Sequence, residues 1–334
     1  MKLKPHLLGI LVILITASIT VFYISRQIFT KSTLTLTSRE NKFTVDFNLA
    51  QKHKNDLSKI LEKLGIFKSV FEGFNFQLDA TSSTALAYVS PIKADISTSD
   101  NTIYLDGNIT RSLLPQNLPV ENLRAPKSSN LIVFAPNLLG LILDKTNLSQ
   151  NVNNWLKLNF EGNNGQYLFV FGSNADFALL TKSDHIDLTT LKNLETGESG
   201  ESPYKEEERN GINYHLLNIS QAQSADSQTL AIFSKDQWAI FASSPEAAYQ
   251  VADSLDSNSE FISIADFKVG NTAALVIILR NLKDDPISQD LVDFFIGQAS
   301  DFNNSQKLKH TIENLEKVVI ILKDTKFSGL INIK

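Results

Sequence analysis

The sequence predicts an α+β protein in which an N-terminal transmembrane helix precedes two α+β domains with mainly antiparallel sheets. Three observations predict this class: a long apolar run near the N-terminus, short stretches of alternating apolar and polar residues, and apolar residues at helical spacing between those stretches. Predicted strands adjoin one another too often for a doubly wound parallel sheet. We expect a leader at residues 1–6, an anchor at 7–24, a first domain at 25–114, a Pro/Asn-rich linker at 115–130 and a second domain at 131–334.

The apolar run from Leu7 to Ile24 contains no charged residue and lies between Lys2 and Lys4 on one side and Arg26 on the other. At about 1.5 Å per residue, a helix of this length measures roughly 27 Å, close to the bilayer hydrocarbon thickness of about 30 Å. A short leader before a first apolar span usually stays in the cytoplasm. The run therefore predicts a signal-anchor in the lipid bilayer of the cell membrane, single-pass, with a cytoplasmic N-terminus and an extracytoplasmic body.

A cleavable signal peptide is the alternative interpretation of the same run. The lysines form a basic n-region, and Thr16, Ala17 and Ser18 are small residues near a possible cleavage point. Apolar residues resume at Ile19 and continue to Ile24, which a membrane span requires and a cleaved signal does not. We therefore favour the anchor.

Composition excludes several classes of function. After the leader, 29 basic residues face 36 acidic ones, a net charge of −7, so the surface should repel phosphate backbones and we expect no nucleic-acid partner. The chain of 334 residues has no cysteine, which excludes disulfides, thiolate metal sites and thiol catalysis. The remainder is long enough for two domains with ordinary cores.

The first domain is expected to open with β structure at residues 33–47, where polar and apolar residues alternate. A helix should follow at 57–64, because its leucines and isoleucine recur at helical spacing. Asp106 and Gly107 predict either a tight hairpin turn or a bulge within one strand. Further strands are expected at residues 74–79, 85–89 and 102–109.

The second domain should combine hairpins with short helices. Ser244, Pro245 and Glu246 supply a cap, a first-turn proline and an N-terminal acid, so a helix should begin there. Strands are expected at 131–135, 167–171, 177–181, 230–233, 238–242, 273–279, 318–322 and 326–333. Other helices are expected at 137–143, 152–158, 287–296 and 308–315.

The layout of residues 123–282 contains a proline before a strand, a tryptophan segment, a tyrosine-bearing turn and a Ser-Pro-Glu helix start. The residues concerned are Pro126, 131–135, 153–156, 167–171, 210–214, 238–241, 243–247, 261–267 and 273–279. This arrangement resembles the bacterial family called domain of unknown function 3352, whose members are membrane-anchored extracytoplasmic proteins. The matching features are caps and packing residues, so the resemblance implies an architecture and supplies no catalytic residue.

No stretch of the chain carries a recognisable catalytic, cofactor-binding or metal-binding motif, so the expected site residues and cofactors are none. The histidines are scattered without metal-ligand spacing, which favours solvent-facing or singly hydrogen-bonded side chains: His6, His53, His185, His215 and His310. Ser183, Asp184 and His185 are triad residue types, but sequence neighbours point apart and do not form a relay.

Four other features each have a structural and a functional interpretation. The glutamates at 195, 198, 201 and 206–208 predict a hydrated acidic loop, with weak calcium binding as the alternative. Asp284 and Asp285 before Pro286 favour a helix start over an acid/base pair. Core packing is favoured over a contact patch for Phe67, Phe71, Phe74 and Phe76. Sequons at Asn108, Asn147, Asn218 and Asn303 would mark glycosylation only in a eukaryotic secretory route, and in an Asn-rich chain they arise readily by chance.

These observations lead to one preferred function class and two alternatives. The preferred class is a non-enzymatic interaction or structural module of the cell envelope, whose partner is an unknown envelope protein or polymer. One alternative is an envelope hydrolase whose carboxylates converge only in the fold. The other is an extracytoplasmic domain that binds a solute or lipid in an apolar pocket.

Overall fold

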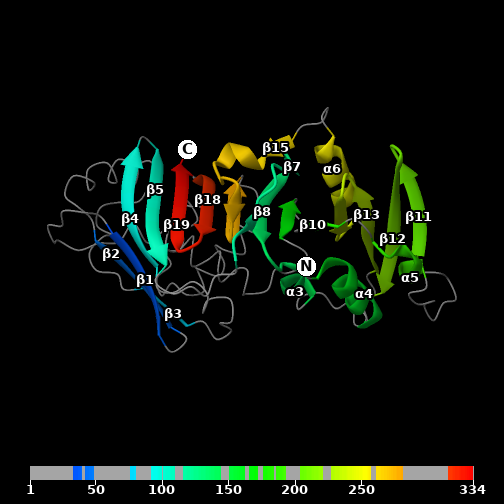
Figure 1. Ribbon diagram of the computed structural model, residues 1–334, viewed down its shortest axis with the longest axis horizontal. Coiled ribbons are helices and arrows are strands. Elements are labelled where there is room, and N and C mark those ends of the chain that lie inside the picture. Colours follow the sequence, from blue (N-terminus) through cyan, green and yellow to red (C-terminus); the bar gives the residue numbers. More distant parts are fainter. Residues whose placement is uncertain are drawn as a thin grey trace. The chain divides into compact units, whose positions relative to one another are not determined.

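The computed structural model describes residues 33–39, 42–48, 76–79, 92–99, 101–109, 116–143, 150–161, 165–171, 176–183, 186–192, 204–220, 227–256, 261–280 and 315–333. Over these residues the protein is mostly antiparallel sheet with few helices (Figure 1). The mainly antiparallel character expected from the sequence is therefore confirmed. The predicted elements at 7–24, 57–64, 85–89 and 287–296 lie outside the described residues.

The chain divides into two compact units, and the second is inserted in the sequence of the first. Unit 1 comprises residues up to Asn117 together with Ala273–Lys334, and unit 2 comprises Leu118–Thr272. This division corrects the expected second domain at 131–334, because the C-terminal residues belong to unit 1. The reason is long-range pairing that no local pattern reveals: Lys326 to Asn332 pair with Thr102 to Asn108.

Among the described residues, the sheet of unit 1 contains eight strands in the order β17-β18-β19-β5-β4-β1-β2-β3, and each strand pairs antiparallel with its neighbours. Its strands are β1 (Thr33–Arg39), β2 (Lys42–Asn48), β3 (Phe76–Asp79), β4 (Ile92–Ser99), β5 (Thr102–Ile109), β17 (Leu275–Arg280), β18 (Leu315–Lys323) and β19 (Lys326–Ile333). The short β16 (Thr272–Ala273) lies at the boundary between the units.

Alternation along β5 and β19 gives these two strands of unit 1 one buried face. On β5, Ile103 and Leu105 are buried whereas Tyr104 and Asp106 are exposed. The last strand, expected at 326–333, has one buried face made of four residues: Phe327, Gly329, Ile331 and Ile333. Gly329 and Ile331 lie opposite the buried Leu105 and Ile103 of β5, so the two strands contribute to one continuous core.

Two details of unit 1 differ from the sequence predictions. Asp106 and Gly107 form neither a turn nor a bulge, because both pair in unbroken register with β4 and β19. The strand β4 was not predicted, since its sequence IKADISTS carries small and polar residues at most positions. Such a strand depends on its two neighbours for pairing and gives a weak local signal.

In the described part of unit 2, the sheet contains seven strands in the order β11-β12-β13-β14-β10-β9-β8. Its strands are β8 (Ser129–Ala135), β9 (Gln166–Phe171), β10 (Asp176–Lys182), β11 (Tyr204–Arg209), β12 (Ile212–Ser220), β13 (Ser227–Lys235) and β14 (Trp238–Ala242). The short strands are β6 (Leu118–Pro119), β7 (Arg124–Pro126) and β15 (Phe261–Ser263), of which β7 and β15 pair antiparallel. The helices are α3 (Leu139–Leu143), α4 (Gln150–Phe160), α5 (Leu188–Lys192), α6 (Pro245–Leu255) and the 3-10 helix η3 (Ile264–Phe267).

Helices cover both faces of this second sheet. In the β13–β14 pair, Ile232 lies opposite Phe241 and Phe233 lies opposite Ile240, so Phe233 and Phe241 face opposite sides. Phe160 at the end of α4 packs edge-on against Phe241, and Tyr249 of α6 packs against Tyr214, which contacts Phe233. Because both faces are covered, every residue of β9 and β14 is buried.

The start of α6 follows the sequence prediction. The Ser244 side chain accepts a hydrogen bond from the backbone N–H of Ala247 at 3.2 Å, Pro245 occupies the first turn, and Glu246 supplies the N-terminal acid. This cap satisfies one of the orphan donors that every helix start leaves. The helix then buries Ala247, Ala248, Val251, Ala252 and Ser254.

A single buried amide joins two helices to strand β9. The Gln166 side chain is fully buried, and its Oε1 accepts hydrogen bonds from the backbone N–H groups of Leu138 and Leu139 at 2.6 and 2.8 Å. Its Nε2 donates to the carbonyl oxygen of Phe160 at 2.6 Å. Gln166 therefore satisfies backbone groups at the start of α3 and at the end of α4, where helices have no internal partners.

Candidate functional site

The acidic run at Glu206, Glu207 and Glu208 forms an edge strand, which corrects the loop predicted there. These residues belong to β11, which pairs only with β12 within the described sheet (Figure 1). The other glutamates of that predicted loop, at 195, 198 and 201, lie outside the described residues. Edge strands commonly carry charges, because charged side chains discourage pairing with other chains. Because β11 has the sequence YKEEER, it lacks the alternation of apolar and polar residues that predicts a strand.

One local signal could have revealed this hairpin. Asn210 and Gly211 connect β11 to β12 with backbone φ angles of 53° and 74°. Two residues at positive φ are what a type I′ turn requires, and Asn-Gly is its most favourable sequence. The dipeptide therefore marked a hairpin even though the strand before it is almost entirely charged.

The strand register sorts the polar side chains of β11 onto two faces. Glu206 lies opposite His215 and Glu207 lies opposite Tyr214 on β12. Because successive side chains of a strand alternate, Tyr204 and Glu206 share one face with His215, and Glu207 and Arg209 share the other. Each face carries its own group of interacting side chains.

We call the first group the Tyr204 cluster; it comprises Lys192, Tyr204, Glu206 and His215. The Tyr204 hydroxyl donates to Glu206 Oε1 at 2.7 Å and lies 2.5 Å from Nδ1 of His215. Since the hydroxyl has one proton, the arrangement that satisfies all three groups has Nδ1–H of His215 donating to the Tyr204 oxygen. Lys192 of α5 completes the cluster with an ion pair to Glu206 and lies 5.8 Å from the centre of the Tyr204 ring.

The protonation states in the Tyr204 cluster follow from burial and from these bonds. The hydrogen bond from Lys192, followed by that from Tyr204, lowers the pKa of Glu206. Burial and then the hydrogen bond to Glu206 raise the pKa of Tyr204, and burial lowers the pKa of His215. At neutral pH the cluster therefore holds an ionised carboxylate, a protonated phenol and a neutral imidazole. A general acid or base works best with a pKa near the operating pH, which neither Tyr204 nor Glu206 has.

The second group, the Tyr249 cluster, comprises Glu207, Arg209, Tyr214 and Tyr249. The Tyr249 hydroxyl donates to Glu207 Oε1 at 2.6 Å, and the Arg209 guanidinium carbon lies 4.2 Å from the centre of the Tyr249 ring. The Tyr249 and Tyr214 rings meet at 90° with centres 4.9 Å apart. Burial is the largest cause that raises the pKa of Tyr249, and of Tyr214, to about 12. Both phenols therefore stay protonated and attach α6 to the edge of the sheet.

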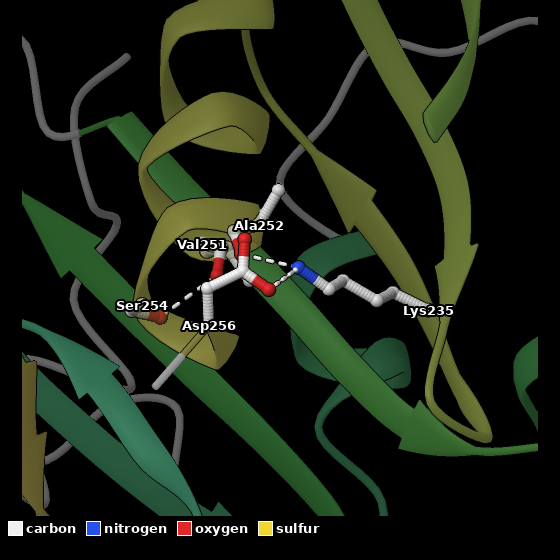
Figure 2. A network of polar contacts seen from close by, with 5 residues as sticks. All are labelled: Lys235, Val251, Ala252, Ser254 and Asp256. Atoms are coloured by element: carbon white, nitrogen blue, oxygen red, sulfur yellow. Dashed lines mark hydrogen bonds and ion pairs between the residues drawn. The ribbon is translucent and has the colours of Figure 1, made fainter. Parts of the chain in front are cut away.

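A third polar network lies at the C-terminal end of α6 (Figure 2). Lys235 of β13 donates from Nζ to the carbonyl oxygen of Ala252 at 3.0 Å and to Oδ1 of Asp256 at 2.6 Å. Ser254 Oγ donates to the carbonyl oxygen of Val251 at 2.8 Å. A cation at this end complements the helix dipole and satisfies a terminal carbonyl. Together with the Tyr249 cluster, this network fixes the middle and the C-terminal end of α6 against the sheet.

The structure places few of the residues that the sequence singled out. His215 is buried and hydrogen-bonded through Nδ1, whereas His6, His53, His185 and His310 lie outside the described residues. Asp184, Asp284 and Asp285, the sequons at Asn147 and Asn303, and Phe67, Phe71 and Phe74 also lie outside them. Asn108 and Asn218 are exposed on strands, and Phe76 belongs to β3. Within the part of the chain that the structure describes, no three His, Asp or Glu side chains converge closely enough to hold a metal ion.

Among the described residues no helix combines the length and the apolar character needed to cross a bilayer. The predicted anchor at 7–24 lies outside those residues.

Comparison with known proteins yields one similar solved structure. No protein-family profile and no curated protein sequence matches the chain. A structure described as crystal form I of TP0453 aligns with 61% of this chain and 88% of its own length, at 11% sequence identity and a TM-score of 0.30. The resemblance to the domain of unknown function 3352 family stays a prediction.

Proposed function

We propose that this chain is a single-pass, membrane-anchored extracytoplasmic protein whose two α+β domains form a non-enzymatic interaction or structural module of the cell envelope. The observation that carries the proposal is the uncharged apolar run of residues 7–24 behind a short basic leader. The transmembrane helix holds the folded units beside the bilayer. The partner is an envelope protein or polymer.

The chemistry of the described polar side chains supports a binding or structural role. In the Tyr204 cluster each titratable group is hydrogen-bonded to a neighbour on β11, β12 or α5. The Tyr249 cluster joins α6 to the edge strand β11, and the network at Lys235 joins α6 to β13. These contacts hold an exposed, charged edge strand in a defined position. A rigid charged edge suits recognition of a partner, because little side-chain or backbone freedom is lost on binding.

Membership of the domain of unknown function 3352 family is part of this proposal. The strands β8, β9 and β14 and the start of α6 occupy the segments that carry the resemblance. Family membership implies the same membrane-anchored extracytoplasmic arrangement.

The test begins with membrane fractionation of the full chain. We expect the protein to remain in the membrane pellet after washing at high pH and to require detergent for release. The matched control replaces Leu11 and Leu14 by Asp, which should release the chain because each charge at the centre of a span costs about 2.5–3.5 kcal/mol on insertion scales. Recovery of the wild-type chain in the aqueous fraction, or a mature N-terminus downstream of Ile24, contradicts the proposal.

Orientation and enzymatic activity need separate measurements. A reporter active only in the cytoplasm, fused after Lys334, should be inactive, and a bright signal would reverse the orientation. Purified full-length protein should release no product from envelope polymers, and reproducible turnover would overturn the non-enzymatic assignment.

A further inference from the structure

The turn between β11 and β12 places a side-chain amide directly before a glycine in an open position. Asn210 and Gly211 are both exposed. The pair Arg209 and Ile212 closes the hairpin, so the two turn residues lie outside the ladder of β11 and β12. A Cβ atom added to Gly211 would meet no other described residue within 4 Å beyond its chain neighbours. The backbone nitrogen of Gly211 is therefore open to the side chain that precedes it.

An asparagine in this position can react with the backbone nitrogen that follows it. The nitrogen of Gly211 attacks Cγ of Asn210 and gives up its proton, while the bond from Cγ to Nδ2 breaks and the side-chain nitrogen leaves as ammonia. The product is a five-membered succinimide ring. Water then opens the ring at one of its two carbonyl carbons and yields aspartate or isoaspartate, in which the main chain runs through Cβ and Cγ. Glycine favours the attack, because it has no Cβ to shield its nitrogen.

The folded hairpin controls how often the reacting atoms meet. A type I′ turn keeps ψ of its first central residue at about +30°, whereas ring closure requires rotation about ψ until the nitrogen of Gly211 faces Cγ of Asn210. The reaction therefore proceeds when the turn opens. Within the described sheet β11 pairs only with β12, and such edge elements open more easily than central strands. The hydrogen bond from Tyr249 to Glu207, at 2.6 Å, is one contact that holds β11 closed.

We propose that Asn210 is a site of spontaneous deamidation, with water as the co-reactant, and that opening of the hairpin of β11 and β12 sets its rate. Either product adds a negative charge two residues from Glu208, at the end of a strand that already carries three glutamates. Isoaspartate also lengthens the main chain by one atom, so the two-residue turn is lost. Modification therefore makes the edge strand more acidic and loosens its pairing with β12 beside the turn. The reaction belongs to this hairpin and does not depend on the proposed envelope function.

Peptide mapping of aged protein measures the modification at single residues. The full-length chain in detergent is kept at neutral pH and physiological temperature in water enriched in heavy oxygen, and is then cleaved after lysine in ordinary water. The peptide from Glu206 to Lys235 contains three asparagines, all exposed: Asn210, Asn213 and Asn218. Replacement of the amide by a hydroxyl that carries solvent oxygen should be at least about tenfold faster at Asn210, because a bulky residue follows each of the other two. Synthetic peptides identify the aspartate and isoaspartate products by their retention times.

Two tyrosine variants test the link to hairpin opening. Tyr249→Phe removes the hydrogen bond to Glu207 on β11, so it should speed the modification of Asn210 by about threefold or more. Tyr167→Phe is the matched control: it removes a hydrogen bond to the Glu121 carbonyl from β9, far from β11 in the strand order, and should leave the rate within about twofold.

Preferential modification of Asn210, faster in Tyr249→Phe than in the wild type and in Tyr167→Phe, supports the inference. Modification of Asn210 no faster than that of Asn213 and Asn218 overturns it, as does an equal rate at Asn210 in Tyr249→Phe and the wild type.

Discussion

Replacing Gln166 by Leu should destabilise unit 2 far more than the loss of one side chain suggests. Gln166 is fully buried on β9, and leucine of similar size can neither accept nor donate a hydrogen bond. The substitution therefore leaves two backbone donors, at Leu138 and Leu139, and one acceptor, at Phe160, without their partner. A buried polar group without a partner costs about 1–3 kcal/mol, so the lower bound for three groups is about 3 kcal/mol.

Intrinsic fluorescence measures this effect in the right part of the chain. The protein has two tryptophans, Trp155 and Trp238, and both belong to unit 2. For a unit of this size, each kcal/mol shifts the unfolding temperature by about 2–4 °C, so we expect a decrease of about 6–12 °C. The measurement is a thermal or urea unfolding curve of the full chain followed by tryptophan emission.

Gln228→Leu is the matched control for this substitution. Gln228 on β13 is half-buried and donates a hydrogen bond to the carbonyl oxygen of Ser243 at 3.1 Å. We expect its loss to cost about 1 kcal/mol or less. If Gln166→Leu destabilises unit 2 no more than Gln228→Leu does, the argument that Gln166 satisfies the ends of α3 and α4 is refuted.

Three further predictions use the same tryptophan signal. Ser244→Ala should cost about 1 kcal/mol by removing the cap of α6, and a free energy of unfolding equal to that of the wild type would contradict this role. Gly165→Ala should lower the free energy of unfolding by more than about 1 kcal/mol, because φ is +93° and the added Cβ would lie 2.7 Å from Phe134 Cε2. Gly211→Ala is the control: φ is +74° but the space around the added Cβ is open, so the decrease should be smaller. Burial lowers the pKa of His215 below its ordinary value of 6.5, so the stabilising neutral form is present above that pH and is lost as the pH falls through the folded-state pKa. His215→Gln should therefore reduce the loss of stability between about pH 7.5 and about pH 5, and an unchanged pH dependence would show that His215 does not cause it.

Local patterns predicted several elements of unit 2 from the sequence. The hairpin strands at 167–171 and 177–181 alternate or are wholly apolar, and they form the antiparallel pair β9 and β10. Ser244, Pro245 and Glu246 mark the start of α6 because capping depends on residues within one turn. Such signals are readable because the interactions that cause them join residues close together in the chain.

The sequence did not predict the polar clusters of unit 2, and the physical reason differs from residue to residue. Glu206 and Glu207 belong to an edge strand. Edge strands commonly carry charged residues, so the amino-acid composition of this strand is like that of a loop. Lys192 and Tyr204 meet across residues 193–203, which local periodicity does not relate. Gln166 gave no signal, since nothing in its neighbourhood shows that the ends of two helices meet its amide.

The sequence by itself determined the mainly antiparallel class, the strands with clear alternation and the capped start of α6, and it supplies the apolar run at 7–24 on which the proposed membrane anchor rests. The tertiary structure decided that the C-terminal strands β18 and β19 complete the sheet of unit 1. Periodicity specifies which face of an element is apolar. Strand order and register depend on contacts between residues far apart in the chain, and those contacts are settled only when the cores form.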